Sequence, residues 1–436
     1  MPKRTIPFLI AIGLFGIGLG YLVNTLDPLF YSEKIRQLAP PTIKNTVLSF
    51  ITIMALLVAL ITQPLVGRWS DHTKNRWGRR TPFLVGGVIG LAVSLGLIAV
   101  AETLWLLVGA AMLISASSNT VQGVWQALIP DRVPDQQRGT AAAIKTLLEG
   151  AGAIIGVSVA GVAVIQGYLT AIPLIGILLF SLILVVTLYA LRRDQPAIRE
   201  EQPPKRRSTS EIRPSLNFPI KSYLKAVPRY LHHLRVHPPA FFWWIINRLL
   251  FWSAGIAVRT FVINYAEDGL NLPLAALQTV DRKVYIFLGG GIILLVMGAG
   301  AAADRLGRRP LLVAAGLLGC AGTISLIVAQ ELPILLVGAG LLATGAGIYS
   351  SASWALATDL APQAKSALYL GIANGATVIG SISGRLGGPV IDGINQLSGS
   401  NSTGYLTVFW IAALFFAGSS FVILKIRPGS PGPSVE

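Results

Sequence analysis

Apolar stretches long enough to cross a bilayer recur along the whole chain and constrain its fold more than any other feature. A membrane-spanning helix takes about 20 residues. In hydrocarbon only helices and closed barrels satisfy their own backbone hydrogen bonds, and the alternating ten-residue strands of a barrel are absent from this sequence. Hydrophobic residues make up 53% of the chain and charged residues 12%, which does not suit a surface in water. We therefore predict an all-α polytopic membrane protein.

Hydropathy predicts twelve spans. They lie at residues 6–26, 46–66, 82–101, 104–127, 140–165, 171–191, 239–263, 284–303, 310–329, 332–354, 367–391 and 404–425. The first run follows Lys3 and Arg4, as the apolar part of a signal peptide would. It is too long for that and lacks a convincing cleavage site, so we interpret it as the first span.

The basic residues indicate the orientation of the chain. The net charge is +16, from 35 Lys and Arg against 19 Asp and Glu. Five basic residues lie in loops on the side opposite the N-terminus, four lie within spans, and the remaining 26 lie in the tails and the loops on the N-terminal side. Positive loops stay inside, so both termini are expected to be cytoplasmic, at the plasma (inner) membrane. No nucleic-acid partner is expected, because such binders combine basic residues with exposed aromatic stacking partners.

One long hydrophilic stretch divides the chain near its middle. We predict a six-helix bundle at residues 1–192, a basic linker at 193–238, a second six-helix bundle at 239–426 and a cytoplasmic tail at 427–436. The linker contains the flexible run Pro203-Pro204-Lys205-Arg206-Arg207-Ser208. Its later part suits either an amphipathic helix on the anionic inner leaflet or a solvated segment.

The two halves of the chain repeat one another at an offset of about 229 residues. The second span is followed by Asp71, Gly78, Arg79 and Arg80. The same residue order follows the eighth span, as Asp304, Gly307, Arg308 and Arg309. A second match joins Asp131 and Pro134 to Asp359 and Pro362. Two matches in register indicate a duplicated six-helix unit.

This repeat resembles the signature of the major facilitator superfamily, in which a Gly, an Asp and a Gly-Arg-Arg run share one loop; here they are Gly67, Asp71, Gly78, Arg79 and Arg80. The resemblance covers the whole chain. The run from Gln122 to Asp131, followed by Arg138 and Gly139, is similar to the glycoside–cation symporter group and its sucrose-transporter-like relatives, as is Tyr369 to Asn374. This sequence departs from that group at two positions. It has Ser115 where the group carries an acid, and Gln126 where the group carries an Arg.

The resemblance implies that the duplicated loop latches the two halves on the cytoplasmic side. The expected gate residues are Asp71, Arg79, Arg80, Asp304, Arg308 and Arg309. A carboxylate at a helix end accepts hydrogen bonds from a neighbouring helix N-terminus and pairs with guanidinium groups. The alternative is that the arginines only enforce topology, although topology alone requires no acid.

Ionisable residues inside spans are costly and are therefore candidates for ion or proton coupling. Glu149 and Arg248 fall near mid-depth of their spans, and Asp27 ends the first span on the outer side. Glu149 either exchanges a proton under the influence of Arg248 or forms a contact with Lys145, four residues earlier.

The resemblance implies a central cavity lined by spans one, four, seven and ten. Amide and aromatic side chains in those spans are candidates to bind a polar, ring-shaped substrate, because amides bond hydroxyls and indole faces stack on sugar rings. They are Asn24, Asn119, Gln122, Trp125, Asn247, Trp252, Tyr349 and Trp354. Each Trp has the alternative role of a membrane-interface anchor, which we prefer for Trp243 and Trp244.

Together these features predict a secondary transporter that works by alternating access as a monomer in the lipid bilayer, with a sugar or glycoside as small-molecule cargo and a proton, or else Na⁺, as coupling ion. Export of a hydrophobic compound and a non-transporting scaffold or receptor are the alternatives. An enzyme is not expected, because no His, Asp or Glu cluster could bind a metal or activate a nucleophile. No cofactor or metal is expected, and Cys320, the single cysteine, excludes a thiolate cluster.

Overall fold

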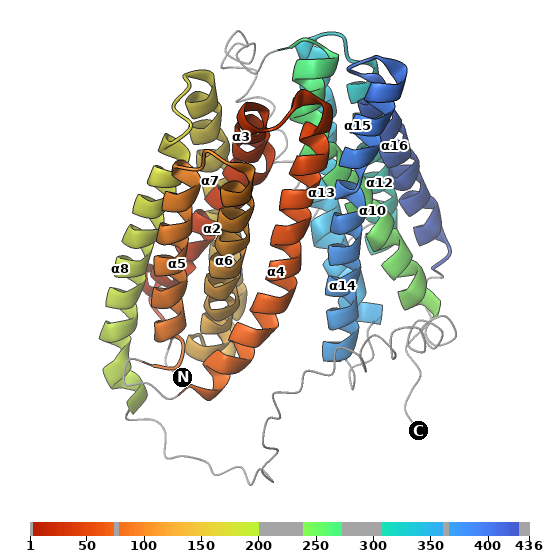
Figure 1. Cartoon of the computed structure of the whole chain (residues 1–436). Coiled ribbons are helices and arrows are strands. Elements are labelled where there is room, and N and C mark those ends of the chain that lie inside the picture. Colours follow the sequence, from red (N-terminus) through yellow and green to blue (C-terminus); the bar gives the residue numbers. More distant parts are fainter. Residues whose placement is uncertain (1–2, 74–77, 200–238, 273–306, 361–365, 427–436) are drawn as a thin grey trace. The chain divides into compact units, whose positions relative to one another are not determined.

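The computed structural model describes residues 3–73, 78–199, 239–272, 307–360 and 366–426, and every regular element in these ranges is a helix (Figure 1). Ten helices in this part of the chain are long and apolar enough to cross a membrane. The predicted all-α polytopic class is confirmed. The predicted span at 284–303 lies outside the described residues. The predicted span at 367–391 falls on two helices, Ser366–Arg385 and Gly387–Ser398, neither of which is among the ten, so the number twelve stays a prediction.

The helices form two compact units, Met1–Gln202 with Asp392–Leu397, and Pro203–Ile391 with Ser398–Glu436. The helices of the first unit are α1 (Ile6–Gly13), α2 (Phe15–Thr25), α3 (Tyr31–Leu38), α4 (Lys44–His72), α5 (Thr81–Ala99), α6 (Leu104–Arg132), α7 (Arg138–Ile165) and α8 (Ala171–Arg199). Those of the second are α10 (Pro239–Asn264), α12 (Arg308–Val328), α13 (Leu332–Leu360), α14 (Ser366–Arg385) and α16 (Thr403–Leu424), and α15 (Gly387–Ser398) is divided between the two units.

The first span of each unit ends in a five-residue π-helix, η1 (Leu26–Phe30) after α2 and η4 (Tyr265–Gly269) after α10. In η1 the amide of Tyr31 reaches back to the carbonyl of Leu26. Pro28 lies inside this turn and has no amide hydrogen to donate, which favours such a break in the regular ladder. The helical stretch therefore continues from Ile6 to Leu38, longer than the predicted 6–26, but its last part, α3, carries Glu33, Lys34 and Arg36 and is not apolar.

The two units use the same pairs of helices to build their interiors. In the first unit α2 packs on α7 and α8, and α5 packs on α6 and α8. In the second unit α10 packs on α14 and α16, and α12 packs on α13 and α16. The order of these helices along each half is the same, so the packing supports the duplication inferred from the loop motifs.

Glycines bring the helix backbones together at the central pair of each unit. A Cβ added at Gly152 or Gly156 of α7 would meet the backbone of Ile17 or Tyr21 on α2. In the second unit a Cβ at Gly384 would meet the backbone of Ser253 on α10. Gly380 makes an equivalent approach to Leu249. Small residues four apart on one face allow such contact without a side chain between the helices.

Gly86 and Gly90 of α5 have the four-residue spacing that allows close helix contact, but only Gly90 lies against another helix. A Cβ at Gly86 would meet nothing, whereas Cβ atoms at Gly87 and Gly90 would both approach Ser117 on α6. The face of α5 that packs on α6 therefore contains Gly87 and not Gly86.

The glycine contacts give a matched pair of substitutions within α7. Gly152→Ala should lower the free energy of unfolding by about 1–3 kcal/mol, because the new methyl group has to displace the backbone of α2. Gly150→Ala should not destabilise the protein, since nothing lies near its Cβ position and Ala favours a helix. Thermal unfolding of the purified variants in detergent measures the difference. Equal stability of the two variants would show that α2 and α7 do not depend on this close approach.

Candidate functional site

A stripe of large polar-tipped side chains lies along α10, at Trp244, Arg248 and Trp252. The four-residue spacing places the three on one side of the helix. Trp244 is fully buried and Arg248 is 3% exposed. The indole N–H groups of both Trp residues are buried and have no hydrogen-bond partner in the part of the chain that the structure describes. Unused donors of this kind are costly inside a protein, so they point to a site that an acceptor can occupy.

The guanidinium of Arg248 is held by hydroxyls and indole rings rather than by a carboxylate. Its Nε donates to Thr377 Oγ1 on α14 at 2.8 Å, and a terminal nitrogen donates to Ser353 Oγ on α13 at 3.1 Å. Its central carbon lies 4.5 Å from the ring centroid of Trp354 and 5.2 Å from that of Trp244. Among the described side chains none with a negative charge pairs with it. Cation–π contacts and hydroxyl acceptors compensate the charge only in part.

A second polar pair fixes the neighbouring position on α10. Asn247 is fully buried, donates from Nδ2 to the Ser419 carbonyl of α16 at 2.9 Å, and accepts from the Tyr349 hydroxyl at 2.8 Å. The Tyr349 ring stacks on Phe251 at 3.6 Å between centroids. Asn247 and Tyr349 thus use their polar groups within the second unit. They help to position the stripe on α10 and add no unused donor to it.

The structure therefore gathers four predicted substrate residues, Asn247, Trp252, Tyr349 and Trp354, around Arg248. Sequence reasoning missed Ser353 and Thr377, because single hydroxyls on spans ten and eleven carry no pattern. It also assigned Trp244 to the membrane interface, and this was wrong: the ring is fully buried beside Arg248. Trp243, by contrast, is only partly buried, with the Lys425 ammonium 4.1 Å from its ring centroid.

The substrate residues predicted in the first unit have more local surroundings. Asn24 and Asn119 donate to carbonyls four residues earlier, at Gly20 and Ser115, and Gln122 is half-buried. Trp125 has no exposed surface, and its indole donates to the Ile12 carbonyl at 2.6 Å. In this conformation Trp125 holds α6 against α1 and offers no face to a ligand, contrary to the stacking role predicted for it.

The predicted coupling acids lie on two elements of the first unit. The Glu149 carboxylate is 3.5 Å from the Lys145 ammonium on the preceding turn of α7, which is the local contact considered above as an alternative. The Lys145 ammonium also lies 4.9 Å from the ring centroid of Trp125. Asp27 is half-buried within η1. These contacts leave proton coupling as a prediction.

The first copy of the loop motif clamps helices within its own unit. Arg79 pairs with Asp131 at 2.5 Å, and Arg80 pairs with Asp131 at 3.0 Å and with Asp71 at 2.6 Å. Arg80 is 9% exposed. Asp131, at the end of α6, thus joins the loop before α5 to α6. A latch between the two halves stays a prediction.

Glycine is needed in both copies of this loop for its backbone shape. Gly78 has φ of 94° and Gly307 has φ of 82°, a region that other residues rarely adopt. Arg309 follows in the second copy and donates to the Leu424 carbonyl at 2.9 Å. Arg308 is partly buried, and Asp304 lies outside the described residues.

Comparison with known proteins identifies the family. The sequence pattern of the Major Facilitator Superfamily matches residues 5–281 and 283–436. Sucrose transport protein SUC3 of Arabidopsis thaliana is 31% identical over 132 residues, which are 25% of this chain and 22% of that protein. Human proton-associated sugar transporter A is 27% identical over 245 residues, 50% of this chain and 31% of that protein. The matched segments thus span less than a third of either relative.

Solved structures share the fold over almost the whole chain. The nucleoside transporter NupG superposes with a TM-score of 0.69 at 13% identity, covering 97% of this chain and 99% of that one. A D-xylose–proton symporter superposes with a TM-score of 0.67 at 16% identity, covering 98% of this chain and 99% of that one.

The chain belongs to the Major Facilitator Superfamily. It is an integral membrane protein of a transporter family and not an enzyme.

The Asp131 cluster leads to a stability prediction. Asp131→Asn should lower the free energy of unfolding by about 1–3 kcal/mol, because it leaves two arginines, one of them largely buried, without their shared carboxylate. Asp71→Asn should cost less than about 1 kcal/mol, since that carboxylate is 53% exposed. Thermal unfolding of both variants measures the order. A larger loss at Asp71 would contradict the assignment of Asp131 as the centre of the cluster.

Proposed function

We propose that this protein is a secondary active transporter that moves a sugar or glycoside by alternating access, coupled to a proton. The family match over nearly the whole chain and the sugar-transporter relatives support the class. The observation that carries the cargo assignment is the α10 stripe. It offers two buried indole N–H groups without an acceptor among the described residues and a guanidinium without a paired carboxylate there.

Hydroxyl groups of a sugar complement these donors. A hydroxyl oxygen accepts from an indole N–H or a guanidinium, while the apolar face of a pyranose ring stacks on an indole. Trp354 is 38% exposed and is positioned by Arg248, so its ring remains available for such stacking. The amide of Asn247 and the hydroxyl of Tyr349 already bond to one another and would fix the stripe rather than contact the cargo.

Glu149 is the proposed proton site. The sucrose-transporter group carries an acid where this chain has Ser115, and here the Ser115 hydroxyl donates to the Ala55 carbonyl of α4, so that position holds no titratable group. Protonation of Glu149 would remove its charge and release Lys145. The Glu149 backbone lies against Gly16 and Gly20 of α2, so this change would act at the central helix pair of the first unit. Na⁺ is the other candidate ion.

We propose that the protein lies in the plasma (inner) membrane with both termini cytoplasmic, an orientation that the distribution of basic residues supports. We propose that the protein acts as a monomer and needs no resident cofactor. Its partners are then the small-molecule cargo and the surrounding lipid, without nucleic acid.

Transport by the pure protein tests this proposal. Proteoliposomes should accumulate a radiolabelled disaccharide or glycoside when a proton gradient is imposed, and accumulation should stop when an uncoupler dissipates the gradient. Correctly oriented protein that moves no sugar under either condition would reject the cargo assignment.

Export of a hydrophobic compound is the second candidate. The indole rings of Trp252 and Trp354 favour it, since both are only partly buried and no acidic side chain among the described residues pairs with Arg248. Expulsion of an uncharged fluorescent hydrophobic compound under the inverted proton gradient, with no sugar flux, would support export over sugar transport.

Arg248 should be essential for cargo affinity. Arg248→Gln should raise KM by about ten- to hundredfold, because a bond from a charged donor contributes roughly 1.5–3 kcal/mol. Arg248→Lys should remain impaired, since an ammonium lacks the flat fork of the guanidinium, which lies over two indole rings and donates two directed bonds to Ser353 and Thr377. Full rescue by Lys would show that only a positive charge is required there.

Glu149 should be needed for coupling but not for binding. Glu149→Gln should abolish proton-driven accumulation and leave equilibrium exchange of labelled for unlabelled cargo within about threefold of wild type, because a neutral side chain imitates the protonated state. Measuring both reactions in the same vesicles separates the two roles. Retained accumulation would move the proton site elsewhere.

A further inference from the structure

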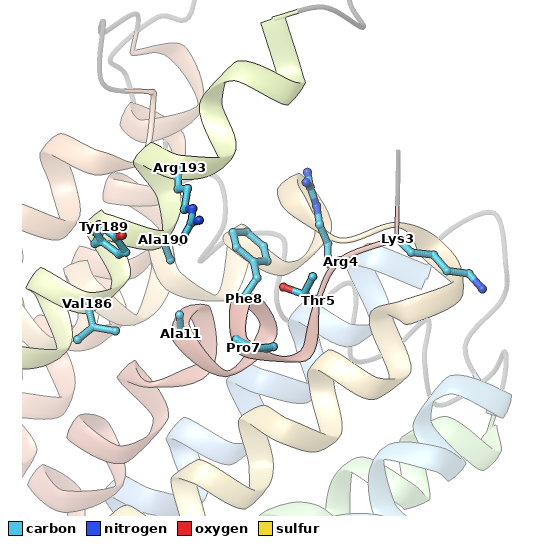
Figure 2. A pocket seen from close by; sticks show the side chains of 10 residues that line it. All are labelled: Lys3, Arg4, Thr5, Pro7, Phe8, Ala11, Val186, Tyr189, Ala190 and Arg193. Carbon is cyan, nitrogen blue, oxygen red and sulfur yellow. The ribbon is translucent and has the colours of Figure 1, made fainter.

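A basic pocket of about 510 Å³ lies between the N-terminal segment and the end of α8, within the first unit (Figure 2). Its cations are Lys3, Arg4 and Arg193, and none of the lining residues among those that the structure describes is acidic. Its apolar floor comprises Pro7, Phe8, Ala11, Val186 and Ala190. A cavity with cations above an apolar floor complements a ligand that is anionic at one end and apolar at the other.

The cations of this pocket differ in how firmly they are held. Arg4 is fixed: its Nε donates to the Arg132 carbonyl at 2.8 Å, and its guanidinium carbon lies 5.3 Å from the ring centroid of Phe8. Its backbone is fixed as well, because its amide donates to the side chain of Gln137. Arg193 is exposed and forms no hydrogen bond or ion pair with the residues that the structure describes. Figure 2 shows the Phe8 ring between these two arginines.

The pocket continues an exposed apolar stripe of α8. Leu178, Leu182 and Val186 are 71%, 60% and 36% exposed, and the same face continues through Tyr189, 66% exposed, to Arg193. The spacing of three and four residues keeps all five on one side of the helix. From Leu182 to Arg193 the helix rises about 16 Å, close to half the roughly 30 Å hydrocarbon thickness.

We propose that this pocket binds the headgroup of an anionic phospholipid, whose acyl chain lies along the α8 stripe. The phosphate would accept hydrogen bonds from Arg193, with Arg4 and Lys3 adding positive charge. Tyr189 lies one turn before Arg193, at the depth where aromatic rings meet the headgroup layer. The bound lipid would join the N-terminal segment to α8, at the end of the bundle where basic loops concentrate. This inference does not depend on the identity of the cargo.

Lipid titration of the purified full-length protein tests the site. Native mass spectrometry in a neutral detergent should show tighter binding of dioleoyl phosphatidylglycerol than of dioleoyl phosphatidylcholine. Arg193→Gln should weaken phosphatidylglycerol binding about fivefold. Arg192→Gln is the matched control: it removes the same charge from the adjacent exposed position, which does not line the pocket, and should leave binding within about twofold. Ala190→Phe, which fills the floor without changing charge, should weaken binding as Arg193→Gln does.

Three results would overturn the proposal. Equal binding of the two lipids would show no headgroup preference. An equal loss in the Arg192 and Arg193 variants would show that general surface charge attracts the lipid. Displacement of phosphatidylglycerol by inorganic phosphate would show a soluble phosphate anion at the same cations. Thermal unfolding in phosphatidylcholine tests whether each variant is folded. If Ala190→Phe is not folded, the two arginine variants decide the question.

Discussion

Close approach of helix backbones in an apolar solvent is the constraint on which the rest of this structure depends. Lipid tails are as apolar as leucine, so hydrophobic burial does little to join helices within a bilayer, and van der Waals contact has to do more. Close contact is supplied by Gly152 and Gly156 of α7, which lie against α2, and by Gly380 and Gly384 of α14, which lie against α10. The central pair of each half is therefore fixed by residues without side chains.

The polar groups of the central helices lie at or beside these close contacts. In the second unit α10 packs on α14 through the glycines, Trp252 lies at the Gly380 contact, and Arg248 donates to Thr377 of α14. In the first unit the Glu149 backbone lies against Gly16 and Gly20 of α2, and Lys145 lies one turn earlier on α7. Charges are expensive in this environment, and each of these is compensated differently: Arg248 by hydroxyls and rings, Glu149 by an ammonium on its own helix. The proposed cargo site and the proposed proton site rest on this difference.

Sequence patterns predicted most of the architecture because their physical causes are local. Span length follows from bilayer thickness, and ten of the predicted spans correspond to helices long enough to cross it. The duplicated Asp-Gly-Arg-Arg loop identified the family, and the positive φ of Gly78 and Gly307 explains why its glycine recurs. Arg248 and four neighbouring side chains were also found from sequence, since polar groups in spans are few. Ser353 and Thr377 were not, because which hydroxyl faces an arginine on another helix depends on helix rotation.

The sequence by itself determined that the chain lies in lipid, that it is helical and that it contains an internal repeat. It also showed which ionisable residues lie within the spans, because each of these properties follows from composition or from spacing along the chain. The tertiary structure decided which of those residues meet. It buried Trp125 against Ile12 and Trp244 against Arg248, it paired Glu149 with Lys145, and it gathered Arg79, Arg80 and Asp71 around Asp131. The physical reason is that every helix presents several faces, and only packing against its neighbours selects the face that each polar group occupies.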